Sequence, residues 1–111
     1  MNKKVEPTFE SIFSEFQKRA AAAAFPSGLI ATQITLTGKL EFRPLYVKAE
    51  DRIVEVAPYE YNNANFYIDA DTDSMASVLS GAKSVASAIA DGTLLINGDA
   101  AQAVMFFELM F

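Results

Sequence analysis

The last stretch of the sequence, residues 100–111, constrains the fold most, because a helix here has almost no polar face. Its only polar residues are Gln102 and Glu108. At helical spacing, one apolar stripe contains Ala100, Ala103, Val104, Phe107, Met110 and Phe111. The apolar residues largely off that stripe are Met105, Phe106 and Leu109. Such a helix is buried on more than one side, or it faces a ligand or a partner.

Two interpretations of this helix stay open. Met and Phe side chains suit the wall of a ligand site because they conform to irregular apolar shapes. The ordinary alternative is a helix that packs in a core or in a dimer. Composition leaves the same choice, because 51% of the 111 residues are hydrophobic, with nine Phe and four Tyr. We expect one domain over residues 1–111, with apolar area that lines a cavity, contacts a partner or fills a core.

An amphipathic helix is predicted over residues 8–25. Thr8 is a suitable N-cap after Pro7, and Phe25-Pro26-Ser27-Gly28 ends the helix. The apolar residues that repeat at helical spacing are Phe9, Ile12, Phe13, Phe16, Ala20, Ala23 and Ala24.

Three strands with tight turns are predicted next. In residues 30–37, Ile30, Thr32, Ile34 and Leu36 alternate with polar neighbours, and Gly38-Lys39 can close a hairpin. Leu40 and Phe42 are out of phase with Leu45 and Val47, so a bulge at Pro44 would return both pairs to one face. Glu50-Asp51 forms the next turn, and the inward residues of the third strand are Val54 and Val56.

The second half alternates strands with short helices. After a loop from Pro58 to Asn63, a strand over residues 65–70 points Phe66, Ile68 and Ala70 inward. Asp71-Thr72-Asp73 caps a helix with Met75, Val78 and Leu79 on its apolar stripe. Val85, Ala86 and Ile89 suggest a further short helix, and Thr93–Asn97 a fifth strand with Leu94 and Ile96 inward. Asp99-x-x-Gln102 is a capping box for the last helix. This order predicts a single α+β domain.

The residue types argue against catalysis by this chain. It contains no His and no Cys, so the commonest general base and the best soft nucleophile are missing. Asp69, Asp71 and Asp73 have the spacing of a calcium loop, but Ser74 and Ser80 replace its Gly and its distal Glu. We therefore expect no enzyme, no cofactor and no metal.

Charge and hydropathy limit the partners and the location. The net charge is −5 and the Lys and Arg clusters are short, which argues against nucleic acid. Lys3 and Lys4 are not followed by an apolar segment of a signal peptide, and no run approaches the ~20 residues of a membrane span. We expect a soluble cytoplasmic protein.

From Ala64 to the C-terminus the sequence resembles the sterol carrier protein 2 (SCP2-like) family. The strand Asn65–Asp69 leads into a capped helix, and Ala90–Asp99 is close to that family's "GKLKIxGD" stretch before an apolar terminal helix. The resemblance implies a five-stranded, mostly antiparallel sheet covered on one face by helices. It also implies an apolar tunnel between them for sterols, fatty acids, acyl-CoA or isoprenoid and quinone lipids.

Three functions compete. The first is non-catalytic carriage of a lipid-like ligand in that tunnel. The second is an interaction or accessory module with a filled core, whose terminal helix docks on a partner enzyme or on itself in a homodimer. The third is an enzyme that uses carboxylates. For the first, the predicted tunnel wall consists of Phe16, Ile34, Val56, Phe66, Ile68, Met75, Leu79, Ile89, Leu94, Ile96, Val104, Met105 and Leu109.

Overall fold

The computed structural model describes residues 5–38 and 42–111. It has an α+β fold in which a five-stranded sheet has the order β3-β2-β1-β4-β5. The elements follow one another as α1 (Phe9–Ala22), β1 (Leu29–Thr37), β2 (Phe42–Glu50), β3 (Ile53–Ala57), β4 (Phe66–Asp71), α2 (Thr72–Leu79), α3 (Val85–Ala90), β5 (Leu94–Gly98) and α4 (Ala100–Met110).

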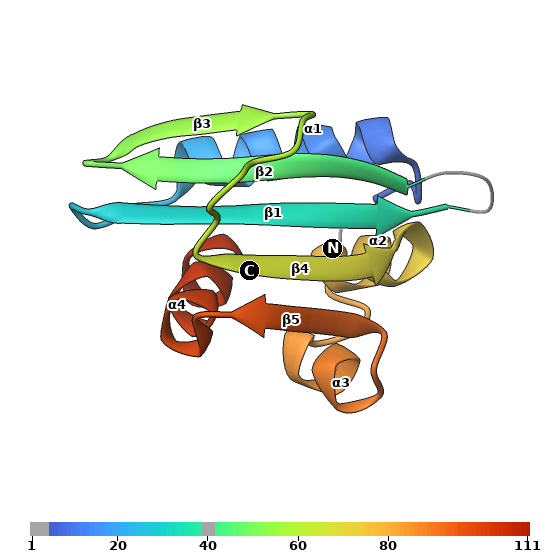
Figure 1. Ribbon diagram of the computed structural model, residues 1–111. Coiled ribbons are helices and arrows are strands. Elements are labelled where there is room, and N and C mark those ends of the chain that lie inside the picture. The colour runs from blue at the N-terminus through green and yellow to red at the C-terminus, as the bar shows by residue number, and fades with distance from the viewer. Residues whose placement is uncertain (1–4, 39–41) are drawn as a thin grey trace.

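The sheet is mixed, with β1 and β4 parallel and the other neighbouring strands antiparallel. Figure 1 shows α1, α2 and α4 behind this sheet, and α3 beside β5. The loop that joins β3 to β4 crosses the opposite face, where the Tyr61 N–H donates to Gln33 Oε1 at 3.0 Å. The predicted mostly antiparallel sheet, covered on one face by helices, is confirmed.

Local signals at the helix starts are confirmed. The side chains of Thr8, Asp71 and Asp99 each accept a hydrogen bond from the backbone N–H three residues later, as N-caps do. The capping box at α4 is only half formed, however. The Asp99 N–H donates to the Asn65 carbonyl at 2.9 Å instead of to the Gln102 side chain.

The predicted bulge at Pro44 is wrong. β1 and β2 pair one residue to one throughout, with Pro44 opposite Thr35. Leu45 and Val47 are buried on the helix side, and Phe42 is 77% exposed on the other side. A regular ladder buries three residues of β2 without a slip, so Phe42 simply stays outside. Leu40 lies outside the described residues.

The turn between β2 and β3 lies one residue further along than predicted. Glu50 pairs with Ile53, so the turn residues are Asp51 and Arg52. Both have positive φ, 50° and 73°, as in the primed turns that suit the twist of a hairpin.

Gly98 shows why a glycine ends β5. Its φ is +117°, and a Cβ there would lie 2.6 Å from the Asn65 carbonyl oxygen and 2.7 Å from Phe66 Cα. Only glycine permits this close approach of β5 to the start of β4. The approach in turn positions Asp99, and with it the first turn of α4, against Asn65.

Candidate ligand-binding site

The candidate site is the apolar layer between the sheet and its helices. Its largest fully buried apolar side chains come from α1, α2, α4 and the four strands β1, β2, β4 and β5, and include Ile12, Phe16, Ile34, Leu36, Leu45, Ile68, Phe66, Met75, Leu94 and Phe106. Large buried side chains occupy this layer. The hollows recorded among the described residues open to solvent at the surface.

Most of the predicted wall residues do meet in this layer. The buried ones are Phe16, Ile34, Phe66, Ile68, Met75, Leu79 and Leu94. Those partly buried against the same cluster are Val56, Ile96 and Leu109. Whether they contact a ligand is a separate question, because the same placement describes a core.

Ile89, Val104 and Met105 are not brought to the layer. They are 45%, 58% and 39% exposed. In α3 the buried residue is Ala88, so Ile89 points outward. In α4 the buried residues are Ala103, Phe106, Phe107 and Met110. The predicted stripe was therefore wrong for Val104, which is outside, and Phe106, which was expected off the stripe and is fully buried.

Aromatic rings link α4 to both the sheet and α1. Phe106 meets Phe66 of β4 edge to face, with ring centroids 5.5 Å apart. Phe107 contacts Phe106 at 5.9 Å and Phe111 at 5.6 Å, and Phe111 meets Phe16 of α1 at 6.0 Å. α4 is thus held by ring contacts on more than one side, as its composition predicted.

Arg19 of α1 is a structural residue that lies outside the apolar stripe predicted for residues 8–25. Its guanidinium donates to the Met110 carbonyl at 3.1 Å and to the Leu79 carbonyl. It also pairs with Glu15 at 2.8 Å and lies 5.5 Å from the centre of the Phe111 ring. Because both carbonyls belong to helix C-terminal turns, one cation joins α1 to the negative ends of α2 and α4.

Two polar oxygens in or beside the layer have no hydrogen-bond partner among the described residues. One is Oγ1 of Thr32, whose residue is 0% exposed, and the other is the buried Oε1 of Gln102. Sequence reasoning placed Thr32 on the inward face but attached no role to it. Its signal is a hydroxyl within an otherwise apolar inward row.

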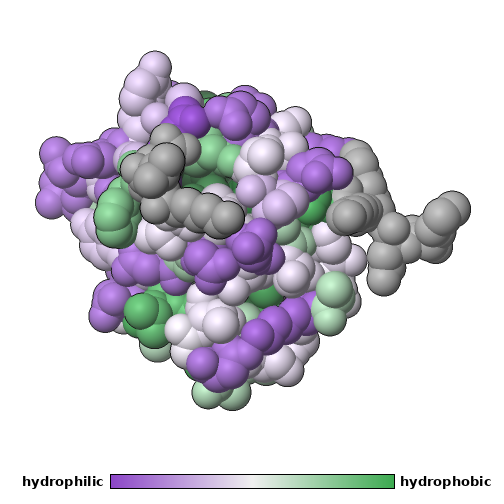
Figure 2. All heavy atoms as spheres, turned by 90° about the vertical axis from the view of Figure 1, so that its right-hand side faces the viewer, coloured by the Kyte–Doolittle hydropathy of each residue, from purple (hydrophilic) through white to green (hydrophobic). Residues whose placement is uncertain are grey.

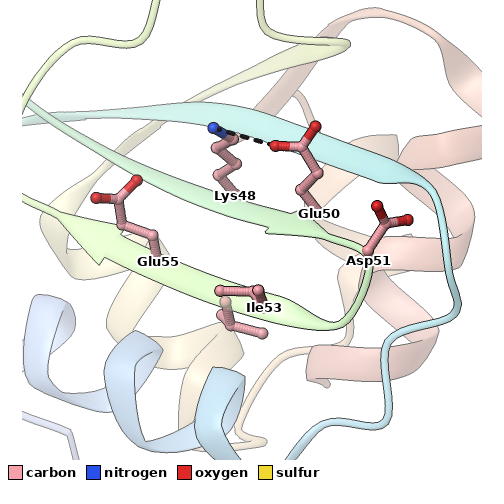
Figure 3. A pocket seen from close by; sticks show the side chains of 6 residues that line it. Lys48, Glu50, Asp51, Ile53 and Glu55 are labelled. Atoms are coloured by element: carbon pink, nitrogen blue, oxygen red, sulfur yellow. Dashed lines mark ion pairs between the residues drawn. The ribbon is translucent and has the colours of Figure 1, made fainter.

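The largest hollow recorded, about 620 Å³, does not suit a lipid. It lies beside the edge strand β3, and its lining is mostly charged: Lys48, Glu50, Asp51 and Glu55, with Ile53 and Val54 as its apolar residues (Figure 3). Lys48 is paired to Glu50 at 3.6 Å. Charged walls favour water over an acyl chain.

A hollow of about 390 Å³ is better suited to a lipid. It is lined by residues of α2, α3 and α4, and its apolar residues Val78, Val85, Phe107 and Phe111 outnumber the charged Lys83 and Glu108. On the face that Figure 2 shows, hydrophobic residues form small separate patches among hydrophilic ones.

Asp69, Asp71 and Asp73 do not form a metal site in the structure. Asp71 caps α2, and its side chain accepts from the N–H and hydroxyl of Ser74 at 3.0 and 2.6 Å. Burial alone would raise the pKa of Asp71, but these hydrogen bonds outweigh it and lower the pKa. Within residues 5–38 and 42–111, no group of carboxylates has the arrangement of a metal site.

The fold and layer agree with a family comparison. The sequence matches the SCP-2 sterol transfer family over residues 9–110. The chain belongs to this family. The earlier resemblance, drawn from the second half, thus extends over nearly the whole chain. No curated protein matches the sequence closely enough to serve as a relative.

Solved structures of SCP2 proteins share the fold. Palmitated SCP2L2 from Aedes aegypti has a TM-score of 0.79 at 16% identity, covering 93% of this chain and 94% of that one. The Aedes aegypti SCP-2 complex with palmitate has a TM-score of 0.65 at 13% identity, covering 99% and 96%. A sec-alkylsulfatase from Pseudomonas sp. contains a similar domain, with a TM-score of 0.57 at 10% identity, 96% of this chain and 14% of the enzyme. At these identities the likeness is one of fold.

One physical limit concerns membranes. No helix in the described part of this SCP2-family chain is long and apolar enough to cross a bilayer.

Proposed function

We propose that this SCP2-family protein binds a lipid-like apolar ligand of the sterol, fatty acid, acyl-CoA or isoprenoid class without catalysing a reaction. The observation that carries the proposal is α4, an almost wholly apolar helix whose Phe106 packs on Phe66 and whose Phe107 lines a mainly apolar hollow. Two relatives of the same fold have structures with palmitate. The chain itself has no His or Cys to supply the usual base or nucleophile.

The proposed ligand enters at the hollow of about 390 Å³, whose size falls within the range of small-molecule sites. Since the layer behind it is filled, the ligand takes the place of rings that now pack there, chiefly Phe106 and Phe107. The wall then consists of the predicted residues that lie in the layer, which are Phe16, Ile34, Val56, Phe66, Ile68, Met75, Leu79, Leu94, Ile96 and Leu109.

A matched pair of substitutions tests this entry. Val85 lines the hollow and is half-buried, whereas Met105 lies on the outer side of α4. Val85→Gln places an amide against a bound chain, where its burial costs about 1–3 kcal/mol, or roughly ten- to hundredfold in affinity. Met105→Gln introduces the same amide into solvent and leaves affinity unchanged.

Displacement of a fluorescent fatty acid and urea unfolding, measured on the same samples, separate binding from folding. Absence of saturable binding to the wild-type protein would refute the lipid proposal. Equal effects of the two substitutions would place the entry elsewhere.

One observation favours the interaction module as the second candidate. Ile89, Leu95, Val104 and Met105 are large apolar side chains on α3, β5 and α4 with exposures of 39–58%. A protein that docks through these residues and binds no lipid would sediment as a dimer or with an enzyme partner. Its association would be lost in Val104→Glu.

A further inference from the structure

Thr32 has an unusual environment for a hydroxyl group. It lies on β1 between Val47 of β2 and Phe66 of β4, with which it shares the helix-facing side of the sheet. Among the described residues, Thr32 is the one polar residue that is buried in the core, with an exposure of 0%. Its Oγ1 has no hydrogen-bond partner in the described part of the chain. Burying an unpaired hydroxyl opposes folding, so an otherwise apolar row would be served better by Val.

Gln102 presents the second unpaired oxygen. It lies on α4 one turn before Phe106 and next to Ala103, both of which are buried, so its side chain belongs to the face that packs on the sheet. A capping box would have used this side chain, but the Asp99 N–H is bonded to Asn65 instead. The buried Oε1 is left as an acceptor without a donor in the described part of the chain.

Asn65 brings the two groups to the same end of the layer. Its N–H donates to the Ala31 carbonyl at 2.8 Å, and its side-chain oxygen accepts from the Ala31 N–H at 2.9 Å, one residue before Thr32. Its carbonyl accepts from the Asp99 N–H, three residues before Gln102. Figure 1 shows α4 at this end of the sheet, where β4 begins.

We propose that Thr32 and Gln102 recognise a hydroxyl group at the polar end of the lipid, so that the preferred ligand is an alcohol. This inference rests on the proposed function, because it requires a lipid in the layer. A hydroxyl can donate its one proton to Gln102 Oε1 while it accepts a hydrogen bond from the Thr32 hydroxyl. The ligand thereby supplies the partners that the folded protein lacks.

Charge argues for an alcohol over an ionised fatty acid at this end. A carboxylate has no proton to donate, so it would leave Gln102 Oε1 unpaired, whereas an alcohol can satisfy it. A buried carboxylate also needs a cation. The basic side chains with recorded ion pairs are engaged elsewhere, Arg19 with Glu15, Arg43 with Glu10, Lys48 with Glu50 and Lys83 with Asp91.

The test compares 1-dodecanol, tridecane and dodecanoate as displacers of a fluorescent probe, at about pH 8 so that the acid is ionised. The variants are Thr32→Val, which removes the hydroxyl at constant shape, and Gln102→Met, which keeps length. Each variant is expected to weaken dodecanol binding about tenfold, the loss of one hydrogen bond to a buried polar group. Tridecane binding is expected to stay the same or to tighten.

Urea unfolding of both variants provides the control for folding. Neither variant is expected to lose stability, because each removes a buried unpaired oxygen. Dodecanol affinity unchanged in a variant overturns the role of that residue, which is the result expected if ordered water alone satisfies it. Dodecanoate binding more tightly than dodecanol overturns the alcohol preference. If none of the three compounds displaces the probe from the wild-type protein, the lipid function itself is refuted. If they bind but neither substitution changes the affinity, only the role of Thr32 and Gln102 is refuted.

Discussion

The guanidinium of Arg19 in α1 donates a hydrogen bond to the backbone carbonyl of Met110 in α4, with 3.1 Å between Nη1 and O. The same side chain donates to the Leu79 carbonyl at the end of α2. Three elements that are far apart in the sequence are therefore joined at one cation. This contact lies next to the Phe111 ring and connects α1 to the C-terminal turns of α2 and α4.

Arg19→Met should lower stability by roughly 2 kcal/mol, or about 10 °C in melting temperature. The reason is that two carbonyls at helix ends lose a charged donor while the aliphatic stem is retained. Arg43→Met is the matched control. Arg43 also pairs with a carboxylate, Glu10, and lies over an aromatic ring, Phe9, but among the described residues it donates to no backbone carbonyl. Thermal melts that show equal losses for both variants would contradict the role of the carbonyls.

Gly98→Ala should cost about 3 kcal/mol, because the new Cβ meets Asn65 and Phe66 backbone and the residue keeps a positive φ. Gly28→Ala is the control. Its φ of +103° is similar, but a Cβ there meets nothing within 4 Å. Urea unfolding should therefore show a clearly smaller loss for Gly28→Ala. If the two losses match, the close approach of β5 to β4 contributes little.

Asp99→Ala should cost about 1 kcal/mol, because its carboxylate accepts from the Gln102 N–H at 3.1 Å as the N-cap of α4. Gln102→Met should not share this loss, since the Gln102 side chain takes no part in the cap. Chemical denaturation of both variants checks the difference. A comparable loss in Gln102→Met would indicate that a full capping box forms in solution.

Asp91 should make stability depend on pH in the acid range. The Lys83 ammonium, with the hydroxyl and N–H of Thr93, lowers the pKa of Asp91 from 3.8 to about 2. A depressed carboxyl pKa stabilises the folded state above pH 3.8, and that contribution disappears as the pH falls through about 2. Asp91→Asn should reduce the pH dependence of the melting temperature between these values, leaving the part due to Glu10 and Asp71, whose pKa values are also lowered. Parallel curves for the two proteins would count against the Asp91 pair.

Local signals were sufficient to predict the elements and the starts of the helices, because these depend on neighbours within a few residues. Thr8, Asp71 and Asp99 were predicted as caps and act as caps, since a side-chain oxygen reaches only its own first turn. The inward row of β4, with Phe66, Ile68 and Ala70, was predicted from alternation and is buried. The family resemblance added a mostly antiparallel sheet with helices on one face, which periodicity alone does not specify.

Which side of each apolar element faces the core depends on contacts that form only on folding. α4 is apolar nearly all round, so no polar face marks its exterior, and contact with Phe66 buries Phe106 rather than Val104. The regular pairing of β1 with β2 left Phe42 outside for the same reason, since burial depends on the partner strand and not on the residue alone. Arg19 and Thr32 gained their significance from groups distant in the chain, Met110, Leu79 and Phe66, whose proximity exists only after folding.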